Sequence, residues 1–438
     1  MKYYIFVDNF RGFSDTCIPI TDVNFLVGEN STGKTSILGL LKLLAGPRFF
    51  FDQAFDSEHI NFGGFSDMVS VHSNDRSYFR IGFVWEELHG KKKTPVVTGC
   101  LLTFKEEEGL PKLAKCTICR GGTKVSMRLG SDIYYREETC ASLSTKTVVS
   151  SLRSQWANEH SGNGGKYTKL VVPPSIGRNM PVLVALSFIM GGNRQRKKRD
   201  EFVFYPPQID FPPELTWLAP IRTKAKRTYD QLTQELFSPE GAHTPYLIRR
   251  MLRSRSKSAA IKFRDFIAKV GKASGLFQDV RIRNFGRGAT APFELDIVLD
   301  GKAFNVSNVG YGVSQSLPVL VEILARPHGT WFAIQQPEVH LHPRAQAALG
   351  DVFFELAAED HKLFLVETHS DFTIDRFRMN YKKDRAIKPD SQILFFERRD
   401  KHNVITPLAI GKKGELPAEQ PDSYRQFFIR EQMNLLGI

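Results

Sequence analysis

Residues 28–35, with the sequence GENSTGKT, fit the phosphate-binding pattern G-x-x-x-x-G-K-[ST] at every fixed position. A short apolar run of strand type, residues 23–27, precedes them, and apolar residues at helical spacing follow over residues 36–44. A strand, a glycine-rich turn and a helix N-terminus aim backbone N–H groups and the helix dipole at one phosphate. Because both flanks are correct, a P-loop is favoured over a chance glycine turn before a buried helix.

The side chains of this P-loop have expected roles. The Lys34 ammonium group should neutralise the β- and γ-phosphates of ATP, and the Thr35 hydroxyl should ligate Mg²⁺. One segment near the N-terminus thus implies both cofactors, ATP and Mg²⁺. The residues of this segment predicted to bind the nucleotide are Asn30, Ser31, Thr32, Gly33, Lys34, Thr35 and Ser36.

A second glycine-containing turn lies in the last third of the chain. Residues 306–315 include Gly310 and Gly312, and they precede a helix predicted from residue 316 to residue 324, with Pro318 in its first turn. Such a turn before a helix N-terminus attracts anions. This segment is therefore a second candidate phosphate-binding site.

Two buried-type strands in the same third of the chain end in polar residues. Residues 331–334 run into the sequence QQPE, and residues 363–366 run into ETHS, which contains His369. A helix predicted over residues 344–359 separates the two strands. Alternating strands and helices indicate a parallel sheet, whose ligands bind at the carboxyl ends of the strands. We therefore expect the P-loop, the cluster 335–338 and His369 to share one sheet edge.

Taken in this order, the motifs resemble those of the ABC-type ATPase heads of the SMC, OLD and related AAA-like families, across almost the whole chain. Residues 310–315 look like the ABC signature in its OLD-like form, residues 333–338 look like the Walker B segment, and His369 looks like the switch histidine. Residues 341–343 stand where the family places its D-loop. The N-F-R sequence that ends at Arg11 resembles the opening of these heads, whose arginine lies near the nucleotide. The last third also resembles small ATPases of anti-phage defence systems such as Septu, PARIS and retron-associated modules.

The resemblance implies an α/β fold: a P-loop NTPase of ABC/SMC head type, with a mixed sheet, an antiparallel β subdomain and a mainly helical basic insertion. Residues 1–130 would form the N-terminal lobe with the P-loop, and residues 131–270 the basic insertion. Residues 271–438 would form the C-terminal lobe with the signature, the Walker B segment and the switch histidine.

The resemblance also implies a mechanism. Two heads pair head to tail as a homodimer or higher homo-oligomer, and each ATP lies between one P-loop and the partner's signature helix. Gly312, Ser314 and Gln315 would contact the γ-phosphate in trans, and His369 would sense it. ATP then holds the dimer together, and hydrolysis or product release loosens it.

One departure from the family concerns the Walker B acids, because Gln335 and Gln336 stand in their places. A carboxamide binds Mg²⁺ poorly and cannot take a proton from water. Gln336 could still orient the attacking water, and Glu338 or Glu367 could supply a carboxylate at an offset that the family does not use. Slow hydrolysis, normal turnover through another carboxylate and binding without hydrolysis all stay open. The predicted catalytic residues are Gln336, Glu338 and His369, and the predicted metal ligands are Thr35 and Gln335.

The net charge of +13 is concentrated in two regions. Residues 194–199 read RQRKKR, and residues 222–264 hold eleven Lys/Arg against three Asp/Glu. Such clustering is typical of a surface that meets nucleic acid or an acidic protein, although a solvated basic face without a partner stays the alternative. No base-reading module is visible, so we expect any nucleic-acid contact by residues 194–264 to be non-specific and to involve phosphates.

Composition and the remaining motifs narrow the class of protein. The 438 residues are 42% hydrophobic and 24% charged, and no window reaches the roughly 18 apolar residues of a membrane helix. The five cysteines and an N-terminus unlike a signal peptide favour a reduced, cytoplasmic protein without a membrane partner. Cys116 and Cys119 are half of a zinc motif and are interpreted as ordinary strand cysteines. Residues 78–84 and 96–104 are predicted to be antiparallel strands, and residues 244–270 are helical in pattern.

The leading functional hypothesis is an ATP-binding and ATP-hydrolysing switch subunit that controls a separate effector, a nuclease or toxin, in anti-phage defence. The sequence after His369 is too short for the TOPRIM nuclease domain of OLD nucleases, so nuclease activity is expected to come from a partner. One alternative is a DNA-clamping, SMC-like maintenance or repair ATPase. Another is an ATP-binding scaffold with little hydrolysis.

Overall fold

The computed structural model describes residues 2–45, 48–57, 60–89, 94–139, 144–156, 166–171, 181–191, 213–230, 236–286 and 291–428. The chain forms two compact units that alternate along the sequence. Unit 1 comprises Met1–Ile20, Asn30–Glu214 and Phe396–Ile405, and unit 2 comprises Thr21–Glu29, Leu215–Phe395 and Thr406–Ile438. The three consecutive segments expected from the sequence are a different division, which stays a prediction. The basic block 194–199 lies outside the described residues.

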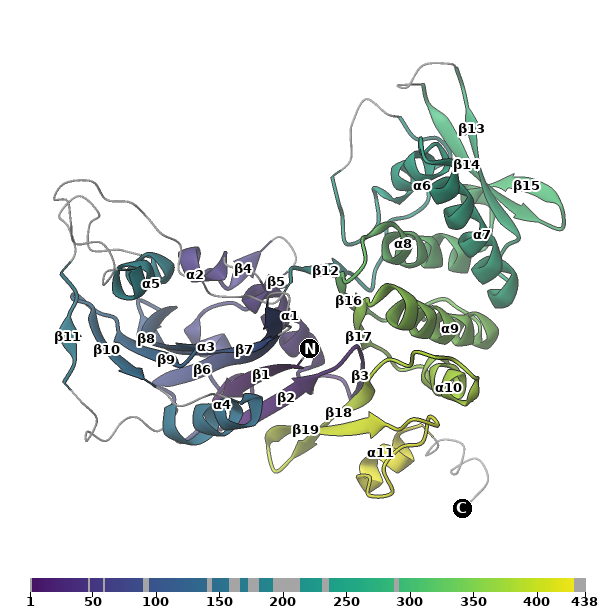
Figure 1. The fold of residues 1–438 in the computed structure, drawn as a ribbon. Coiled ribbons are helices and arrows are strands. Elements are labelled where there is room, and N and C mark those ends of the chain that lie inside the picture. The colour runs from purple at the N-terminus through teal and green to yellow at the C-terminus, as the bar shows by residue number, and fades with distance from the viewer. Residues whose placement is uncertain are drawn as a thin grey trace. The chain divides into compact units, whose positions relative to one another are not determined.

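Unit 1 is built on an antiparallel sheet that, within the described residues, has eight strands in the order β11-β10-β9-β8-β7-β6-β1-β2 (Figure 1). The long central pair confirms the predicted antiparallel strands, with Phe79 opposite Phe104 and Ile81 opposite Leu102. The rings of Phe79 and Phe104 stack with their centroids 5.2 Å apart. The strands are β1 (Lys2–Asp8), β2 (Thr16–Ile20), β6 (Tyr78–His89), β7 (Thr94–Glu107), β8 (Leu110–Arg120), β9 (Thr123–Arg128), β10 (Tyr134–Thr139) and β11 (Thr168–Lys169).

The cysteines of unit 1 support the interpretation from sequence. Cys116 and Cys119 are buried in strand β8 and Cys100 is buried in strand β7, and none of these three forms a disulfide within the described residues. The remaining elements of this unit are α1 (Lys34–Leu44), α2 (Phe49–Asp52), β4 (Asp56–Ser57), β5 (Ile60–Asn61), α3 (Phe65–Met68), α4 (Thr145–Ser151), a π-helical turn (Leu152–Trp156) and α5 (Val182–Gly191).

Unit 2 contains most of a second sheet, with the order β12-β16-β17-β3-β18-β19 among the described strands. The pairs β12–β16, β16–β17 and β17–β3 are parallel, as the alternation of strands and helices predicted. Asp400 and Lys401, both with positive φ, join β18 to β19 in a two-residue turn of the type that connects antiparallel strands, so the sheet is mixed. The strands are β12 (Leu215–Leu218), β16 (Trp331–Gln335), β17 (Leu363–Glu367), β3 (Val23–Gly28), β18 (Ser391–Arg399) and β19 (His402–Ile410).

The helices of unit 2 differ from the sequence pattern at two places. The helical pattern of 244–270 forms two helices, because the Ser256 side chain accepts a hydrogen bond from the Ala259 N–H and starts a new helix there. The helix predicted from residue 316 begins at Tyr311, so Pro318 lies inside it rather than in its first turn. The helices are α6 (Thr244–Leu252), α7 (Lys257–Ser274), α8 (Tyr311–Ala325), α9 (Pro343–Asp360), α10 (Asp371–Met379) and α11 (Asp422–Phe427), with 3-10 turns at Val306–Asn308 and Asn380–Lys382.

The arrangement of unit 2 places α8, α9 and α10 along one face of its sheet (Figure 1). A small antiparallel sheet of β13 (Asp279–Asn284), β14 (Phe293–Leu299) and β15 (Lys302–Asn305) lies beside α6 and α7 (Figure 1). Both the mixed and the antiparallel sheets of the predicted α/β fold are therefore confirmed.

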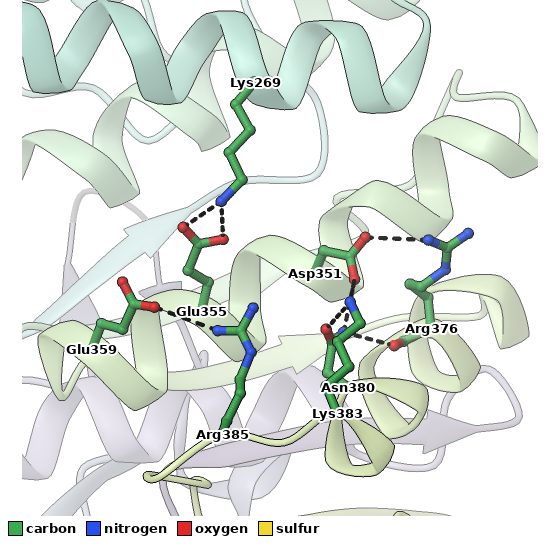
Figure 2. A network of polar contacts seen from close by, with 8 residues as sticks. All are labelled: Lys269, Asp351, Glu355, Glu359, Arg376, Asn380, Lys383 and Arg385. Atoms are coloured by element: carbon green, nitrogen blue, oxygen red, sulfur yellow. Dashed lines mark hydrogen bonds and ion pairs between the residues drawn. The ribbon is translucent and has the colours of Figure 1, made fainter.

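An acidic row along α9 connects this helix to its neighbours (Figure 2). The Lys269 Nζ of α7 lies 2.6 Å from the Glu355 carboxylate, and the Asn380 Nδ2 donates to the Asp351 carboxylate at 2.7 Å. Arg376 of α10 also reaches Asp351, at 3.4 Å. Each of these partly exposed pairs is worth less than about 1 kcal/mol, but together they hold α9 between α7 and α10.

Candidate nucleotide-binding site

The P-loop residues that belong to unit 1 have the backbone that phosphate binding needs. Ser31 has a φ of 61° and Gly33 a φ of 92°, both in the left-handed region. Gly33 is the N-cap of α1, and no side chain caps this helix end. The amides of the first turn therefore present the positive end of the helix dipole without a competing capping side chain.

Gly33 is required by a neighbouring ring as well as by its backbone angle. A Cβ at this position would lie 2.5 Å from Cε2 of Phe13. The turn that contains Phe13 is held by Asn403, whose Nδ2 donates to the Arg11 carbonyl at 2.9 Å and whose backbone N–H donates to the Gly12 carbonyl at 2.8 Å. The Arg398 guanidinium donates to the Ser31 carbonyl at 2.9 Å. Residues of the β18–β19 hairpin thus support the P-loop within unit 1.

Arg11 lies beside the first turn of α1, and its predicted place near the nucleotide stays a prediction. Its Nη1 lies 3.3 Å from the Ser36 hydroxyl, and its Nη2 donates to the Phe62 carbonyl at 2.9 Å. The guanidinium carbon lies 4.8 Å from the centre of the Phe62 ring. Burial lowers the pKa of Arg11, although the Asp67 charge opposes the shift. These contacts place a cation next to the residues that would meet the phosphates.

At the carboxyl edge of the unit 2 sheet, the predicted Walker B residues meet the end of β17. The Gln335 Nε2 donates to the Glu367 Oε2 at 3.2 Å, and the Gln336 N–H donates to the Glu367 carbonyl at 2.7 Å. Gln336 has a φ of 42°, so the chain leaves the strand direction there. With its nitrogen engaged, Gln335 presents only Oε1 to a cation.

Glu338 holds the backbone of the predicted switch histidine. Its Oε1 accepts a hydrogen bond from the His369 N–H at 2.7 Å, while its buried Oε2 has no hydrogen-bond partner among the described residues. Burial raises the pKa of Glu338, and backbone amides and the charge of Arg222 oppose that shift. The His369 ring stacks on Phe427 of α11, with the centroids 6.4 Å apart.

Arg222 is a residue of this edge to which the sequence analysis gave no role. It is only 3% exposed, and its Nη2 donates to the Gln335 carbonyl at 3.2 Å. Its Nη1 is buried without a hydrogen-bond partner in the described part of the chain, and burial lowers its pKa to about 10. The sequence held one signal of this role: Arg222 directly follows an apolar strand segment. An arginine that is buried in such a place needs a charged partner.

The segment that resembles the signature packs against His340, directly before the predicted D-loop residues 341–343. A Cβ on Gly312 would lie 2.9 Å from the His340 carbonyl oxygen, and the rings of Tyr311 and His340 meet edge to face at 4.7 Å. The Ser314 hydroxyl donates to the Tyr311 carbonyl at 2.8 Å. Ser314 and Gln315 are buried, so Gly310 and Tyr311 form the exposed part of this helix end.

The predicted site residues that the structure describes fall into separate groups. Arg11, Ser31, Gly33 and Ser36 lie together in unit 1, and Gly312, Ser314 and Gln315 lie in the first turn of α8 in unit 2. Gln335, Gln336, Glu338 and His369 lie together at the carboxyl ends of β16 and β17. The strand β3, which ends at Gly28 where the P-loop begins, lies beside β17 and parallel to it. The expected sharing of one sheet edge is confirmed for the strands, and the roles of the side chains stay predictions.

The residues present fit Mg²⁺ held largely by a nucleotide. Within the described residues, no group of three or more His, Cys, Asp or Glu could hold a metal ion alone. Mg²⁺ at nucleotide sites is usually bound by one or two protein oxygens together with phosphates and water. The predicted metal ligands are oxygens of this kind: the hydroxyl of Thr35 in unit 1 and the amide oxygen of Gln335 in unit 2, each described only within its own unit.

Two family models match the sequence. Residues 195–375 match the model described as "AAA domain, putative AbiEii toxin, Type IV TA system", and residues 1–95 match the model described as "AAA ATPase domain". The chain is therefore similar to AAA ATPase domains over both segments. A search of curated proteins found no match. In the part of the chain that the structure describes, no helix has the length and apolar character of a membrane span.

Several solved structures are similar over most of their length. The SMC head domain from Thermotoga maritima is 12% identical, with a TM-score of 0.40, covering 93% of this chain and 98% of that one. The Smc head domain from Pyrococcus furiosus, bound to the C-terminal domain of ScpA, is 10% identical, with a TM-score of 0.35 and coverage of 100% and 99%. The recombination mediator RecF is 10% identical, with a TM-score of 0.31 and coverage of 93% and 98%.

Proposed function

We propose that this chain is an ATPase switch subunit: it binds ATP with Mg²⁺, hydrolyses it slowly, and uses the bound state to assemble with a second copy and control a separate effector. The observation that carries the proposal is the P-loop, in which the left-handed Gly33 opens an uncapped helix end directly before Lys34. The similarity of residues 1–95 to an AAA ATPase domain supports the same reading.

Each group of the site has a task in binding. The first-turn amides of α1 and the Lys34 ammonium bind the phosphates, and Arg11 adds a second positive charge beside Ser36. Thr35 is the predicted Mg²⁺ ligand of unit 1 and Gln335 that of unit 2, and Mg²⁺ when bound would neutralise phosphate charge. These tasks require only groups that the sequence provides.

Slow hydrolysis follows from the side chain at position 336. Gln336 can orient a water molecule but cannot accept its proton, so it offers no general base. Glu338 is committed to the His369 N–H, and it therefore positions the predicted switch histidine rather than water. The site supports tight binding better than fast turnover.

Assembly and effector control are the finer parts of the proposal. The exposed Gly310 and Tyr311 open α8, whose N-terminus has no side-chain cap, and such a helix end suits a phosphate presented by a second copy. The model matched by residues 195–375 is described as a putative AbiEii toxin of a Type IV TA system. Control of a separate effector in phage defence goes beyond that description and is part of the proposal.

Nucleotide binding and phosphate release, measured side by side, test this function. Lys34→Ala should weaken the binding of a fluorescent ATP analogue by about 100-fold, the scale of losing a close charge pair, and abolish phosphate release. Lys42→Ala is the matched control, since Lys42 lies on the same helix and pairs with Glu214 instead. Equal binding by Lys34→Ala and the wild type would contradict the proposal. Binding without detectable phosphate release would leave the scaffold alternative.

Light scattering tests the assembly step, and copurification tests the effector. The wild type should gain mass with ATP and Mg²⁺, and Lys34→Ala should not. Purification after expression from the native operon should bring a second protein in fixed ratio, retained in high salt. A chain that always purifies alone contradicts effector control while leaving ATP binding intact.

A nucleic-acid-clamping ATPase is the second candidate, and one surface favours it. At the corner between α6 and α7, the side chains of Arg250, Arg253, Arg255, Lys257, Lys262 and Arg264 are exposed. None of them forms an ion pair with another described residue. A row of exposed cations that form no ion pairs is suited to phosphates of a nucleic acid.

The salt dependence of DNA binding separates this candidate from a solvated basic face. A duplex of random sequence should bind at low salt, with an affinity that falls steeply as salt rises. Arg253→Glu with Arg255→Glu should remove most of this affinity, whereas Lys412→Glu with Lys413→Glu, exposed elsewhere in unit 2, should not. No binding at low ionic strength would eliminate the candidate.

A further inference from the structure

A small cavity lies beside α8, and all the residues that line it belong to unit 2. Its volume is about 40 Å³, and its walls come from residues 223–229, the start of α6, β14, the 3-10 turn at Val306 and α8. The exposed residues Gly310 and Tyr311, which would meet a second copy, do not line it. The functions proposed above therefore give this cavity no role.

The interior of the cavity is aliphatic. Leu295, Val306 and Leu317 line it, and each is at most 3% exposed. Because one water molecule needs about 10–15 Å³ of such volume, the cavity has room for about three waters. That room suits a branched group of about three carbon atoms and is too small for an aromatic ring or a nucleotide base. The part of a ligand that enters must be a short aliphatic group.

The mouth of the cavity is positively charged. Lys224 and Lys226 are the charged residues among those that line it, and both are exposed. Neither ammonium group forms an ion pair with another described residue. Glu240, beside the lining residues in sequence, accepts a hydrogen bond from the Ser238 hydroxyl at 2.6 Å and does not line the cavity. Two cations without a carboxylate favour an anionic group at the mouth.

One polar group in the wall is buried without a partner. Thr244 lines the cavity and is 3% exposed, and its Oγ1 has no hydrogen-bond partner among the described residues. An unpaired buried hydroxyl is costly, so such a group usually marks a place where a water or a ligand atom binds. The Thr244 hydroxyl can donate to a carboxylate oxygen.

The walls of the cavity are held by contacts within unit 2. The Lys226 N–H donates to the Tyr229 hydroxyl at 3.0 Å, which fixes the backbone at one lysine. The His243 Nε2, directly before Thr244, lies 3.1 Å from the Glu322 Oε2 of α8. This contact joins the start of α6 to α8. A preformed apolar cavity with a few polar groups is typical of a ligand site.

We propose that this cavity binds a short aliphatic carboxylate. The hydrocarbon part occupies the aliphatic interior, one carboxylate oxygen lies at the two lysines, and the other accepts a hydrogen bond from the Thr244 hydroxyl. Such a group occurs in free branched-chain acids and at the C-terminus of a polypeptide that ends in valine. The assignment does not depend on nucleotide binding.

The binding of isovalerate to the full chain without nucleotide, measured by ligand-observed NMR, tests the assignment. Its Kd should be on the order of 1 mM, as suits a ligand of about seven heavy atoms. Isovaleramide, the uncharged analogue of the same shape, should bind about tenfold more weakly. Lys224→Gln with Lys226→Gln should weaken isovalerate binding by about tenfold. Lys412→Gln with Lys413→Gln, exposed elsewhere in unit 2, is the matched control and should not.

Three results would overturn the assignment. The first is the absence of saturable isovalerate binding. The second is equal binding of isovaleramide, because the site would then not select an anion. The third is an affinity that stays unchanged when both lysines are replaced, because the probe would then bind elsewhere.

Filling the cavity is a second test. Ala242 lines it and is partly buried, so Ala242→Leu should abolish isovalerate binding. Ala268→Leu, at a partly buried position of α7 that does not line the cavity, is the control and should bind as the wild type does. Isovalerate binding that persists in a folded Ala242→Leu overturns the assignment. If this variant unfolds, the substitutions of the exposed lysines still decide.

N-acetylvaline distinguishes the two sources of the carboxylate. It is isovalerate with an added acetylated amine, and it therefore represents the last residue of a polypeptide. An affinity equal to or above that of isovalerate assigns the site to a C-terminus. A lower affinity assigns it to a free acid.

Discussion

The P-loop of unit 1 and the β16–β17 edge of unit 2 hold their polar groups by different means. The P-loop depends on backbone shape: left-handed φ at Ser31 and Gly33 and an uncapped helix end. The edge depends on buried side chains, with Arg222 and Glu338 supporting Gln335 and His369. The P-loop thus depends on Gly33 having no side chain, whereas the edge depends on which side chains stand at its positions. The binding and the hydrolysis proposed above therefore depend on different kinds of structure.

The largest expected effect comes from a substitution that disturbs the backbone of the P-loop. Gly33→Ala puts a Cβ 2.5 Å from the Phe13 ring, at a position whose φ is 92°. The variant should either lose about 3 kcal/mol of folding free energy or relieve the clash by distorting the P-loop. Nucleotide affinity should fall by about 100-fold. Gly301→Ala is the control, since φ there is 76° but nothing lies within 4 Å of the added Cβ.

Isothermal titration with ATP and urea unfolding measure both variants. Gly301→Ala should lose only about 1 kcal/mol of stability, the cost of the left-handed backbone, and keep its affinity. An affinity unchanged in Gly33→Ala would show that the ring contact does not shape the P-loop.

A smaller effect, a gain of activity instead of a loss, is expected from a substitution at the β16–β17 edge. Gln336→Glu introduces a general base at the predicted position and should raise the rate of phosphate release by at least about 10-fold, with ATP affinity unchanged. Gln278→Glu, exposed at the start of β13, is the control. A rate that stays at the wild-type level means that Gln336 does not limit hydrolysis.

The smallest effect concerns pH and Glu338. Burial raises the pKa of this carboxyl in the folded protein above its ordinary value of 4.5, so the folded state holds the proton more tightly than the unfolded state. The stability that this group contributes is complete below pH 4.5 and decreases as the pH rises through the folded pKa. Glu338→Gln keeps an oxygen for the His369 N–H but removes the titration, so its stability relative to the wild type should increase with pH.

Urea unfolding at pH 5 and pH 8 measures that change: the stability of the variant relative to the wild type should be higher at pH 8 than at pH 5. Asp371→Asn, at the exposed start of α10, is the control for removing an acid. If the free energies of unfolding of Glu338→Gln and the wild type change equally with pH, burial does not destabilise the ionised Glu338 carboxylate.

The sequence predicted those features of the fold and the site that depend on the local pattern of residues. The P-loop, the strands before it and the strand ends at Gln335 and Glu367 follow from residue order and periodicity alone. Arg222 was missed because its importance comes from Gln335 and Glu338, which are more than a hundred residues away. The earlier start of α8 was missed because glycines at 310 and 312 suggest a loop, whereas the D-loop packs on Gly312 and supports a helix.

The support of the P-loop by Asn403 has a consequence for biosynthesis. The hydrogen bond from Asn403 to Arg11 spans 392 positions of sequence, and that from Arg398 to Ser31 spans 367. At a synthesis rate of about 10 residues per second, the ribosome adds Asn403 about 40 s after Arg11. A nascent chain thus carries the complete phosphate-binding motif without its brace, and the P-loop can take its described shape only after Asn403 has been added.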